Sequence, residues 1–142
     1  MLGQQVAENW NSLGGLIQIS MPPLVDEEDR HLHMTSVLFS ILKGELEVWI
    51  AYNEEKQERI VFTTIIQKDQ VSRVRDLLIY SFTAVSRDLR IWEAEKVFDV
   101  LRRYASKNGC QSIIAYSGNE KVINFLASQG ADVSYSLIKF EV

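Results

Sequence analysis

Three apolar runs of strand length lie between residues 45 and 85, separated only by short polar breaks. They are ELEVWIAY (45–52), RIVFTTIIQ (59–67) and DLLIYSFTAV (76–85), and they are rich in the β-branched and aromatic residues that favour strands. Because only the polar stretches NEEKQE and KDQVSR link them, the runs predict an antiparallel meander. The third run is apolar almost throughout, which predicts a central place in the sheet.

After the meander, helical and strand patterns alternate. Ser86 or Asp88 is expected to cap a helix that runs to about Lys107. CQSIIAY then predicts a strand, residues 120–129 predict a short helix, and ADVSYSLIKFEV (131–142) predicts a final strand. A meander followed by such alternation predicts an α+β (mixed α/β) fold, with helices on both faces of a central mixed sheet.

The residues before the meander predict helices and one short strand. Residues 2–11 have an amphipathic helical pattern, with Val6 and Trp10 on one side. GGLIQIS (14–20) is consistent with a short strand. Residues 26–43 predict a helix, because acidic residues crowd its first turn and Gly44 provides a natural stop.

Length and composition indicate an ordinary globular chain. Its 142 residues, 46% of them hydrophobic and 24% charged, suffice for one core. We expect a single domain over residues 1–142, in which residues 1–25 form an N-terminal extension packed on the rest. The net charge of −4 argues against nucleic acid as a partner, because phosphate contacts need clustered Lys and Arg. Its one basic group is more simply a solvated helix face (Lys96, Arg102, Arg103 and Lys107).

The cysteine count and the apolar runs bear on the compartment. Cys110 is the single cysteine, which suits a reducing compartment, and its simplest role is that of a small core residue. The N-terminal residues lack the pattern of a signal peptide, and no apolar run is long enough to span a bilayer. We therefore expect no membrane partner and a cytoplasmic protein, or one packaged into a particle.

The order and lengths of these elements resemble the GNAT acetyltransferase superfamily over residues 26–142. The best anchor is FDVLRRYASKNGCQSIIAYSGNEKVINFLASQGADV (98–133). It looks like the family's long helix, Gly stop, strand, Asn-led helix and Gly before the last strand. The resemblance implies a GNAT-like fold and, in an active member, N-acetyl transfer from acetyl-CoA.

A shorter stretch is similar to one subgroup. In GNEKVINFLASQGADV (118–133), the combination "GN", "I-x-F-L" and "GA" resembles the small GNAT-like internal virion proteins of short-tailed bacteriophages. An unrelated cellular GNAT protein could show the same pattern. The phage resemblance implies a role in the virion or its assembly. The partners would then be virion components or further copies of the chain, and the location the host cytoplasm or the virion.

The family's phosphate loop tests whether a coenzyme can bind. In the family, the pyrophosphate lies on backbone N–H groups at the start of the helix after the meander, in the pattern Gln/Arg-x-x-Gly-x-Gly/Ala. That pattern falls on LRIWEA (89–94), where Trp92 stands in place of the key glycine. We expect the indole to fill the phosphate space and the carboxylates of Glu93 and Glu95 to repel a phosphate. The resemblance leaves a degenerate set of coenzyme-binding candidates: Val85, Arg87, Arg90, Trp92, Ala94 and Asn119.

The catalytic groups of the family are also incomplete. Many members protonate the departing thiolate with a Tyr seven residues after the Asn of the last helix, and counting from Asn119 that residue is Leu126. Leucine cannot transfer a proton. Tyr116 is a candidate substitute. The alternative is that Tyr116 is an ordinary aromatic residue at a strand end, with its hydroxyl in solvent. The candidates for a base, which are also simple surface or turn charges, are Glu45, Glu47 and Asp76.

The two histidines do not predict a metal site. His31 and His33 are two apart in a predicted helix and so point in different directions, and no Cys or acidic pair completes a metal face. The sequence contains no Gly-x-Ser-x-Gly, and Cys110 has no obvious His partner. We expect neither a metal nor nucleophilic hydrolysis.

Two functional hypotheses follow. The first is a GNAT-fold protein without acetyltransferase chemistry or a bound cofactor, which acts through contacts with other proteins in a phage particle or its assembly. The second is a divergent acetyl-CoA-dependent N-acetyltransferase. Loss of the phosphate-loop glycines and of the positioned Tyr favours the first.

Overall fold

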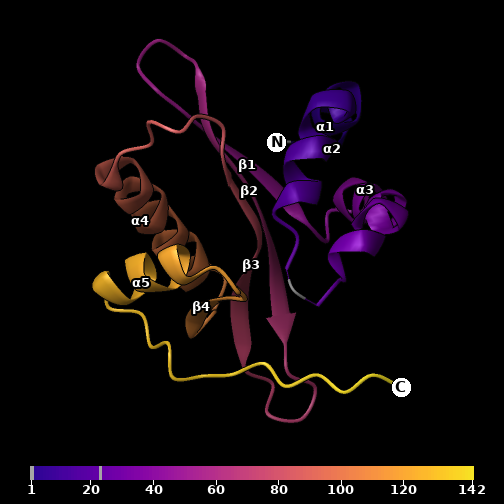
Figure 1. Ribbon diagram of the computed structural model, residues 1–142, viewed down its shortest axis with the longest axis vertical. Helices are drawn as coiled ribbons and strands as arrows, with labels where there is room; N and C mark the ends of the chain where they lie inside the picture. Colours follow the sequence, from indigo (N-terminus) through magenta and orange to yellow (C-terminus); the bar gives the residue numbers. More distant parts are fainter. Residues whose placement is uncertain (1, 23) are drawn as a thin grey trace.

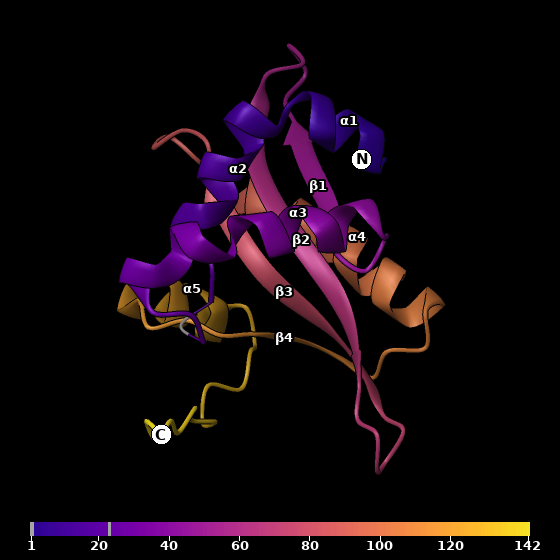
Figure 2. The same ribbon diagram turned by 90° about the vertical axis from the view of Figure 1, so that its right-hand side faces the viewer.

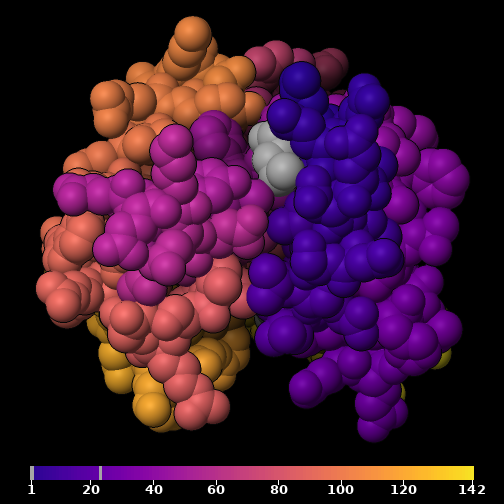
Figure 3. Space-filling model, turned by 90° about the horizontal axis from the view of Figure 1, so that it is seen from above, coloured from indigo at the N-terminus to yellow at the C-terminus, as the bar shows by residue number. Residues whose placement is uncertain are grey.

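The computed structural model describes residues 2–22 and 24–142, with a central sheet between two layers of helices. Helices α1 (Gly3–Glu8), α2 (Trp10–Ile19) and α3 (Met34–Leu42) lie on one side, and α4 (Ile91–Lys107) and α5 (Glu120–Ser128) on the other (Figure 1). Figure 2 shows α2 and α3 across the face of the sheet. Seen from above, the indigo N-terminal residues cover one side of the molecule (Figure 3).

The sheet has four strands in the order β1-β2-β3-β4. The meander of β1 (Glu47–Tyr52), β2 (Glu58–Lys68) and β3 (Arg75–Ala84) is antiparallel, and β4 (Ser112–Ala115) joins β3 in parallel. The predicted meander is therefore confirmed, and β3 lies inside the sheet as expected. This mixed sheet with flanking helices confirms the predicted fold class.

Aromatic side chains tie the meander together on the α4 side. Trp49, Phe62 and Phe82 are register partners on adjacent strands. The rings of Trp49 and Phe62 stack with centroids 5.7 Å apart, and those of Phe62 and Phe82 stack at 5.9 Å. Tyr104 of α4 meets Trp49 edge-on at 5.0 Å. Such aromatic pairs add to the stability that burial alone provides, so they hold α4 against the sheet.

The N-terminal helices form the first of two cores. Val6, Leu13 and Ile17 are buried with Val37 and Ile41 of α3, against Val48 and Val61 of the sheet. The strand predicted at residues 14–20 is wrong, because residues 14–19 belong to α2 and Ser20 is its C-terminal cap. Burial of Leu13, Gly14 and Ile17 on one helical face outweighs the low helix propensity of two glycines. The helix predicted over 26–43 is instead a 3₁₀ helix, η1 (Glu27–His33), followed by α3.

The second core lies between α4 and the sheet. The α4 residues Ala94, Val97, Leu101 and Ala105 are buried at helical spacing. Leu101 has no exposed surface and packs in a cluster with Ile60, Phe62 and Leu77. The predicted cap at Ser86 or Asp88 is wrong, because the cap residue is Arg90 and Ser86 bonds to Asp88 instead.

The chain after α5 departs from prediction. Gly130 ends the helix region with a φ of 92°, which favours glycine. The strand predicted at residues 131–142 is wrong for this structure, because that segment has no regular secondary structure and every residue in it is exposed. It runs in extended form beneath the sheet towards the side of α3 (Figure 1).

None of the helices in residues 2–22 and 24–142 is long and apolar enough to span a membrane.

Candidate functional site

The candidate site lies where the two parallel strands end. β3 and β4 pair only from Asp76–Ser112 to Ile79–Ala115, and β3 continues through residues 80–84 without β4 beside it. Because the strands are parallel, their carboxyl ends point the same way, and α4 and α5 follow those ends. The ends of parallel strands and the N-termini of the following helices are common places for ligands in such sheets.

The first turn of α4 is occupied by its own carboxylate. The backbone N–H of Arg90 donates a hydrogen bond of 2.7 Å to Oε2 of Glu93. A carboxylate at this position satisfies an otherwise free donor and is favoured by the helix dipole. Glu93 thus sits where an anionic ligand of the helix would compete with it.

Arg59 of β2 holds that carboxylate in place. Its Nε lies 2.9 Å from Oε1 of Glu93, and its Nη1 lies 2.9 Å from Oδ1 of Asp88. The side chains of Arg59 and Glu93 are only 16% and 11% exposed. The hydrogen bond from Arg59, followed by that from the Arg90 backbone, lowers the pKa of Glu93. The Ser86 hydroxyl, followed by Arg59, lowers the pKa of Asp88.

Several solved structures that are similar to this chain are acetyltransferases. An aminoglycoside acetyltransferase from an uncultured soil metagenomic sample matches at a TM-score of 0.69 and 12% identity, with 100% of this chain and 93% of that chain covered. AAC(6')-Iy, in complex with the bisubstrate analog CoA-S-monomethyl-acetylneamine, matches at 0.66 and 16% identity, covering 97% and 92%. Glucosamine-6-phosphate N-acetyltransferase from Arabidopsis thaliana matches at 0.60 and 14% identity, covering 95% and 92%.

The chain has a GNAT fold. At these identities the likeness shows the fold alone. No family model matches the sequence, and no curated protein is similar to it in sequence. The GNAT resemblance drawn from the sequence is thus confirmed for the fold, and each site residue must be judged on its own surroundings.

The indole of Trp92 lies partly exposed near the start of α4. Its side chain is 49% exposed, and the Lys96 Nζ lies 4.9 Å from its ring centroid. This cation–π contact, between residues four apart, holds the indole along the outside of α4. The carboxylate that accepts a hydrogen bond at this helix start belongs to Glu93, one residue further on.

The other phosphate-loop candidates lie around the same turn. The Val85 backbone N–H donates to the Arg59 carbonyl at 2.9 Å, so it serves the β2–β3 pairing. Arg87 and Arg90 are exposed, and Ala94 is a buried residue of α4. As folded, this turn does not fit a pyrophosphate, because a carboxylate held by the half-buried Arg59 already accepts from the amide of its cap residue, Arg90.

The start of α5 carries the remaining candidates. Asn119 is the cap of α5, and its Oδ1 accepts hydrogen bonds from the N–H groups of Lys121 and Val122 at 3.0 and 3.4 Å. Tyr116 is half-buried in the link between β4 and α5, at the same end of the sheet as Glu93. Leu126, which replaces the family's Tyr, is half-buried in α5. The structure therefore brings Tyr116 and Asn119 to the end of the sheet that holds the α4 turn.

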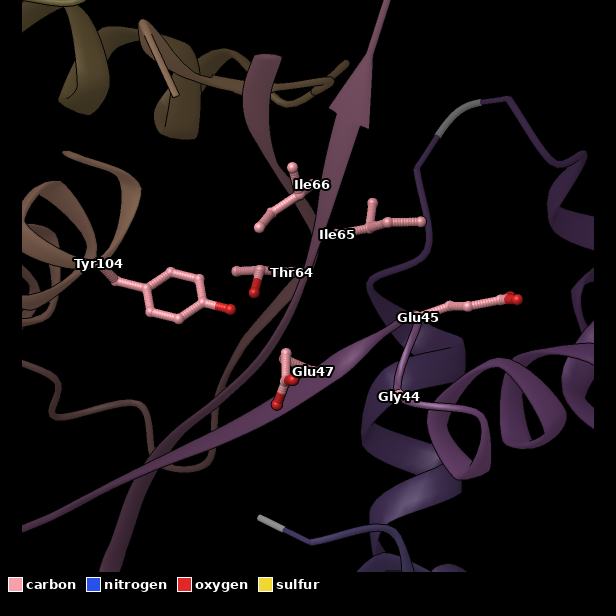
Figure 4. A pocket seen from close by; sticks show the side chains of 7 residues that line it. All are labelled: Gly44, Glu45, Glu47, Thr64, Ile65, Ile66 and Tyr104. Carbon is pink, nitrogen blue, oxygen red and sulfur yellow. The ribbon is translucent and has the colours of Figure 1, made fainter. Parts of the chain in front are cut away.

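A cavity of about 350 Å³ lies elsewhere, near the last turns of α4. It is lined by Glu47, Thr64 and Tyr104, and the Tyr104 hydroxyl points towards the other two (Figure 4). Burial, followed by the charge of Glu47, raises the pKa of Tyr104. Glu45 also lines the cavity but points the other way (Figure 4). The candidate bases Glu45 and Glu47 thus lie near the C-terminal end of α4, whereas Glu93 lies at its N-terminal end.

Asp76 and the histidines have no catalytic setting. The Ser112 hydroxyl donates to Oδ1 of Asp76 at 2.5 Å, which ties the first residues of β3 and β4 together. His31 and His33 are exposed on η1. Among the residues that the structure describes, no three His, Cys, Asp or Glu side chains group to hold a metal ion.

The sequence missed the Arg59–Glu93 pair. No capping signature marked Glu93, because Arg90, and not a Ser, Thr, Asp or Asn, stands three residues before it. Arg59 gave no sign, because 34 residues separate it from Glu93 along the chain. Only the meander brings the two together.

Proposed function

We propose that this GNAT-fold protein does not transfer acetyl groups and acts through contacts with other proteins. One observation carries the proposal: the carboxylate of Glu93 takes the leading amide of α4 while Arg59 neutralises it. A coenzyme pyrophosphate would have to displace a carboxylate that is already charge-paired and hydrogen-bonded. Leu126, in place of a Tyr, adds a second missing group.

Calorimetric titration with acetyl-CoA tests the proposal. We expect no binding to the wild-type chain stronger than about 1 mM. Glu93→Ala frees the Arg90 amide and leaves Arg59 with Asp88 as its remaining ion-pair partner, so this variant is expected to gain affinity for coenzyme A. Trp92→Gly restores the family's glycine but leaves Glu93 in place, and is expected to gain none.

The matched pair of variants separates two reasons for a lost site. Binding by Trp92→Gly alone would mean that the indole, and not Glu93, is the obstacle. Micromolar binding of acetyl-CoA by the wild-type chain would contradict the proposal itself. Circular dichroism on both variants checks that each keeps the fold.

The second candidate is a divergent N-acetyltransferase that uses acetyl-CoA. What supports it is the placement of Tyr116 at the same end of the sheet as the first turn of α4, with the indole of Trp92 turned outwards. Three similar structures are of acetyltransferases or carry a coenzyme A analog. In this reading Glu93 swings away when the coenzyme binds, Tyr116 supplies the proton, and Arg87 and Arg90 meet the phosphates.

A thiol-release assay over a panel of amines decides between the candidates. Release of coenzyme A that falls in Tyr116→Phe and in Arg87→Ala or Arg90→Ala supports the enzyme. Absence of release across the panel supports the interaction protein.

We place the interaction in a phage particle or its assembly because residues 118–133 resemble small internal virion proteins. The neighbouring genes test this placement. Tail, portal or packaging genes beside the coding sequence support it, and a metabolic operon contradicts it.

A further inference from the structure

β2 continues past the start of β1 and has an open edge there. β1 begins at Glu47, which lies opposite Thr64, whereas β2 stays paired with β3 as far as Lys68. Among the residues that the structure describes, residues 65–68 therefore have a neighbouring strand on one side only. Figure 2 shows the β2–β3 hairpin projecting beyond β1. An open edge of this kind is a template for a further strand.

The edge is open because the residues before β1 turn back towards α3. Gly44 has a φ of 76°, which favours glycine and lets the chain change direction. The N–H groups of Glu45 and Leu46 both donate to the Ser40 carbonyl of α3, at 2.9 and 3.2 Å. These amides serve the end of the helix and not a ladder with β2. The chain itself thus supplies no strand beside residues 65–68.

The cavity near the last turns of α4 lies at this edge. Its lining includes Thr64, Ile65 and Ile66 of β2, together with Glu47 and Tyr104. The volume of about 350 Å³ is near the lower end of the range for small-molecule sites. The cavity therefore suits one long side chain better than a molecule the size of a coenzyme.

The groups that face the cavity accept hydrogen bonds, and its formal charges are negative. The Tyr104 hydroxyl points towards Glu47 and Thr64 (Figure 4). The Thr64 hydroxyl is held in place by the Trp49 indole N–H, which donates to it at 2.9 Å. No Lys or Arg lines the cavity, and among the described residues neither Glu45 nor Glu47 forms an ion pair. The cavity therefore favours a cationic group.

We propose that the open edge of β2 binds an extended segment of a partner protein, and that an arginine of this segment enters the cavity. The inference rests on the proposed role in protein contacts and names one surface and one kind of partner for it. Main-chain hydrogen bonds to residues 65–68 hold the segment, and the cavity selects its side chain. A guanidinium has five donors in a planar fork and is more weakly hydrated than an ammonium, so it suits a carboxylate flanked by two hydroxyls.

NMR titration with a short peptide tests the inference. The peptide has five residues and blocked ends, and carries one central arginine flanked on each side by valine and threonine. We expect it to shift the amide signals of residues 65–68. Two N-methylated versions each lack one set of alternate amide hydrogens. Only one of them is expected to lose binding, because alternate amides of a strand face the same neighbour.

The charge of the arginine is tested from both sides. Citrulline in its place keeps the shape and removes the charge, and is expected to weaken binding at least about tenfold. Glu47→Gln should weaken the arginine peptide to a similar degree and leave the citrulline peptide unchanged. Tyr104→Phe removes one acceptor, keeps the ring that meets Trp49, and should have a smaller effect. Glu45→Gln is the matched control and should bind as wild type does, because Glu45 points away from the cavity (Figure 4).

Three results would overturn the inference. The first is that no peptide shifts the signals of residues 65–68 at millimolar concentration. The second is equal binding of the arginine and citrulline peptides. The third is that these signals shift with protein concentration alone, because the edge would then take another copy of the chain.

The inference and the proposed function can fail separately. Titration with acetyl-CoA reports on the N-terminal end of α4, whereas the cavity lies near its C-terminal end. Lack of peptide binding would remove this surface and leave the acetyl-CoA result as it stands. Micromolar coenzyme binding beside intact peptide binding would contradict the proposed function and support the surface.

Discussion

The side-chain hydroxyls of Thr63 on β2 and Ser81 on β3 share a hydrogen bond of 2.6 Å in the interior of the sheet. The two residues are register partners and are 0% and 2% exposed. Burying a hydroxyl without a partner is costly, so each group offsets the cost of the other. The pair is a buried side-chain hydrogen bond that links two largely apolar strands.

Removing one member of this pair is predicted to cost more than removing both. Thr63→Val leaves the Ser81 hydroxyl without its partner, and we expect the free energy of unfolding to fall by about 1–3 kcal/mol. Thr63→Val with Ser81→Ala removes both hydroxyls and is expected to be more stable than the sum of the single variants. Urea unfolding of the three variants measures this coupling, and strictly additive losses would contradict it.

Leu101 is predicted to be the most sensitive position of α4. Its side chain is fully buried between the helix and the sheet, so Leu101→Ala leaves a cavity and should lower the free energy of unfolding by about 2–5 kcal/mol. Val100→Ala is the matched control, because Val100 is 42% exposed on the same helix, and its loss should stay within about 0.5 kcal/mol. Equal losses at the two positions would contradict the packing described for α4.

The Arg59 cluster, in which Arg59 pairs with Glu93 and Asp88, predicts a loss of stability in acid. The pKa of Glu93 lies below its ordinary 4.5 and that of Asp88 below 3.8. A carboxyl with a lowered folded-state pKa contributes stability above its unfolded-state pKa and loses it as pH falls through the folded-state value. Urea unfolding should therefore show a declining free energy of unfolding below about pH 5.

Glu93→Gln tests the origin of that decline. The amide cannot ionise, so the variant should be less stable than wild type near neutral pH and should lose less as the pH falls. Glu95→Gln, two residues further on and exposed, is the control that should follow wild type. Identical pH profiles for Glu93→Gln and wild type would exclude this pair as the source.

Asn119 is predicted to hold the start of α5. Asn119→Ala removes the acceptor of the Lys121 and Val122 amides, and loss of such a cap costs about 0.5–2 kcal/mol. Because α5 buries none of its residues, the effect should be local, as faster hydrogen exchange of these two amides. Asn119→Asp keeps an acceptor and should keep slow exchange. Asn124→Ala, in the exposed middle of the helix, is the matched control.

The sequence predicted elements whose causes are local. Gly44 and Gly130 stand at positive φ after the helices they were expected to end, and Asn119 caps the helix it precedes. The meander followed from short polar breaks, which leave adjacent strands no room for a crossover. Each of these features is decided within a few residues of chain.

The failures had causes in packing, one of them local and one far away in the chain. Residues 14–20 read as a strand, but α2 needs Gly14 where a Cβ would come within 3.2 Å of the Trp10 ring, so the glycine serves packing and not a break. The start of α4 was misplaced because Arg59, on another strand, draws Asp88 away from a capping role. At the candidate site, the same arginine decides which group occupies the helix terminus.

The sheet separates two cores that share no buried side chain, one beneath α1–α3 and one beneath α4. Mutations in α1–α3 and in α4 should combine nearly additively, since these helices pack on opposite faces of the sheet and their buried residues belong to different cores. The N-terminal layer of α1–α3 can therefore change in sequence, or be replaced by other helices, with little effect on the structure of the Arg59 cluster. A lineage could in this way acquire new binding partners on one surface while the opposite surface keeps its inherited form.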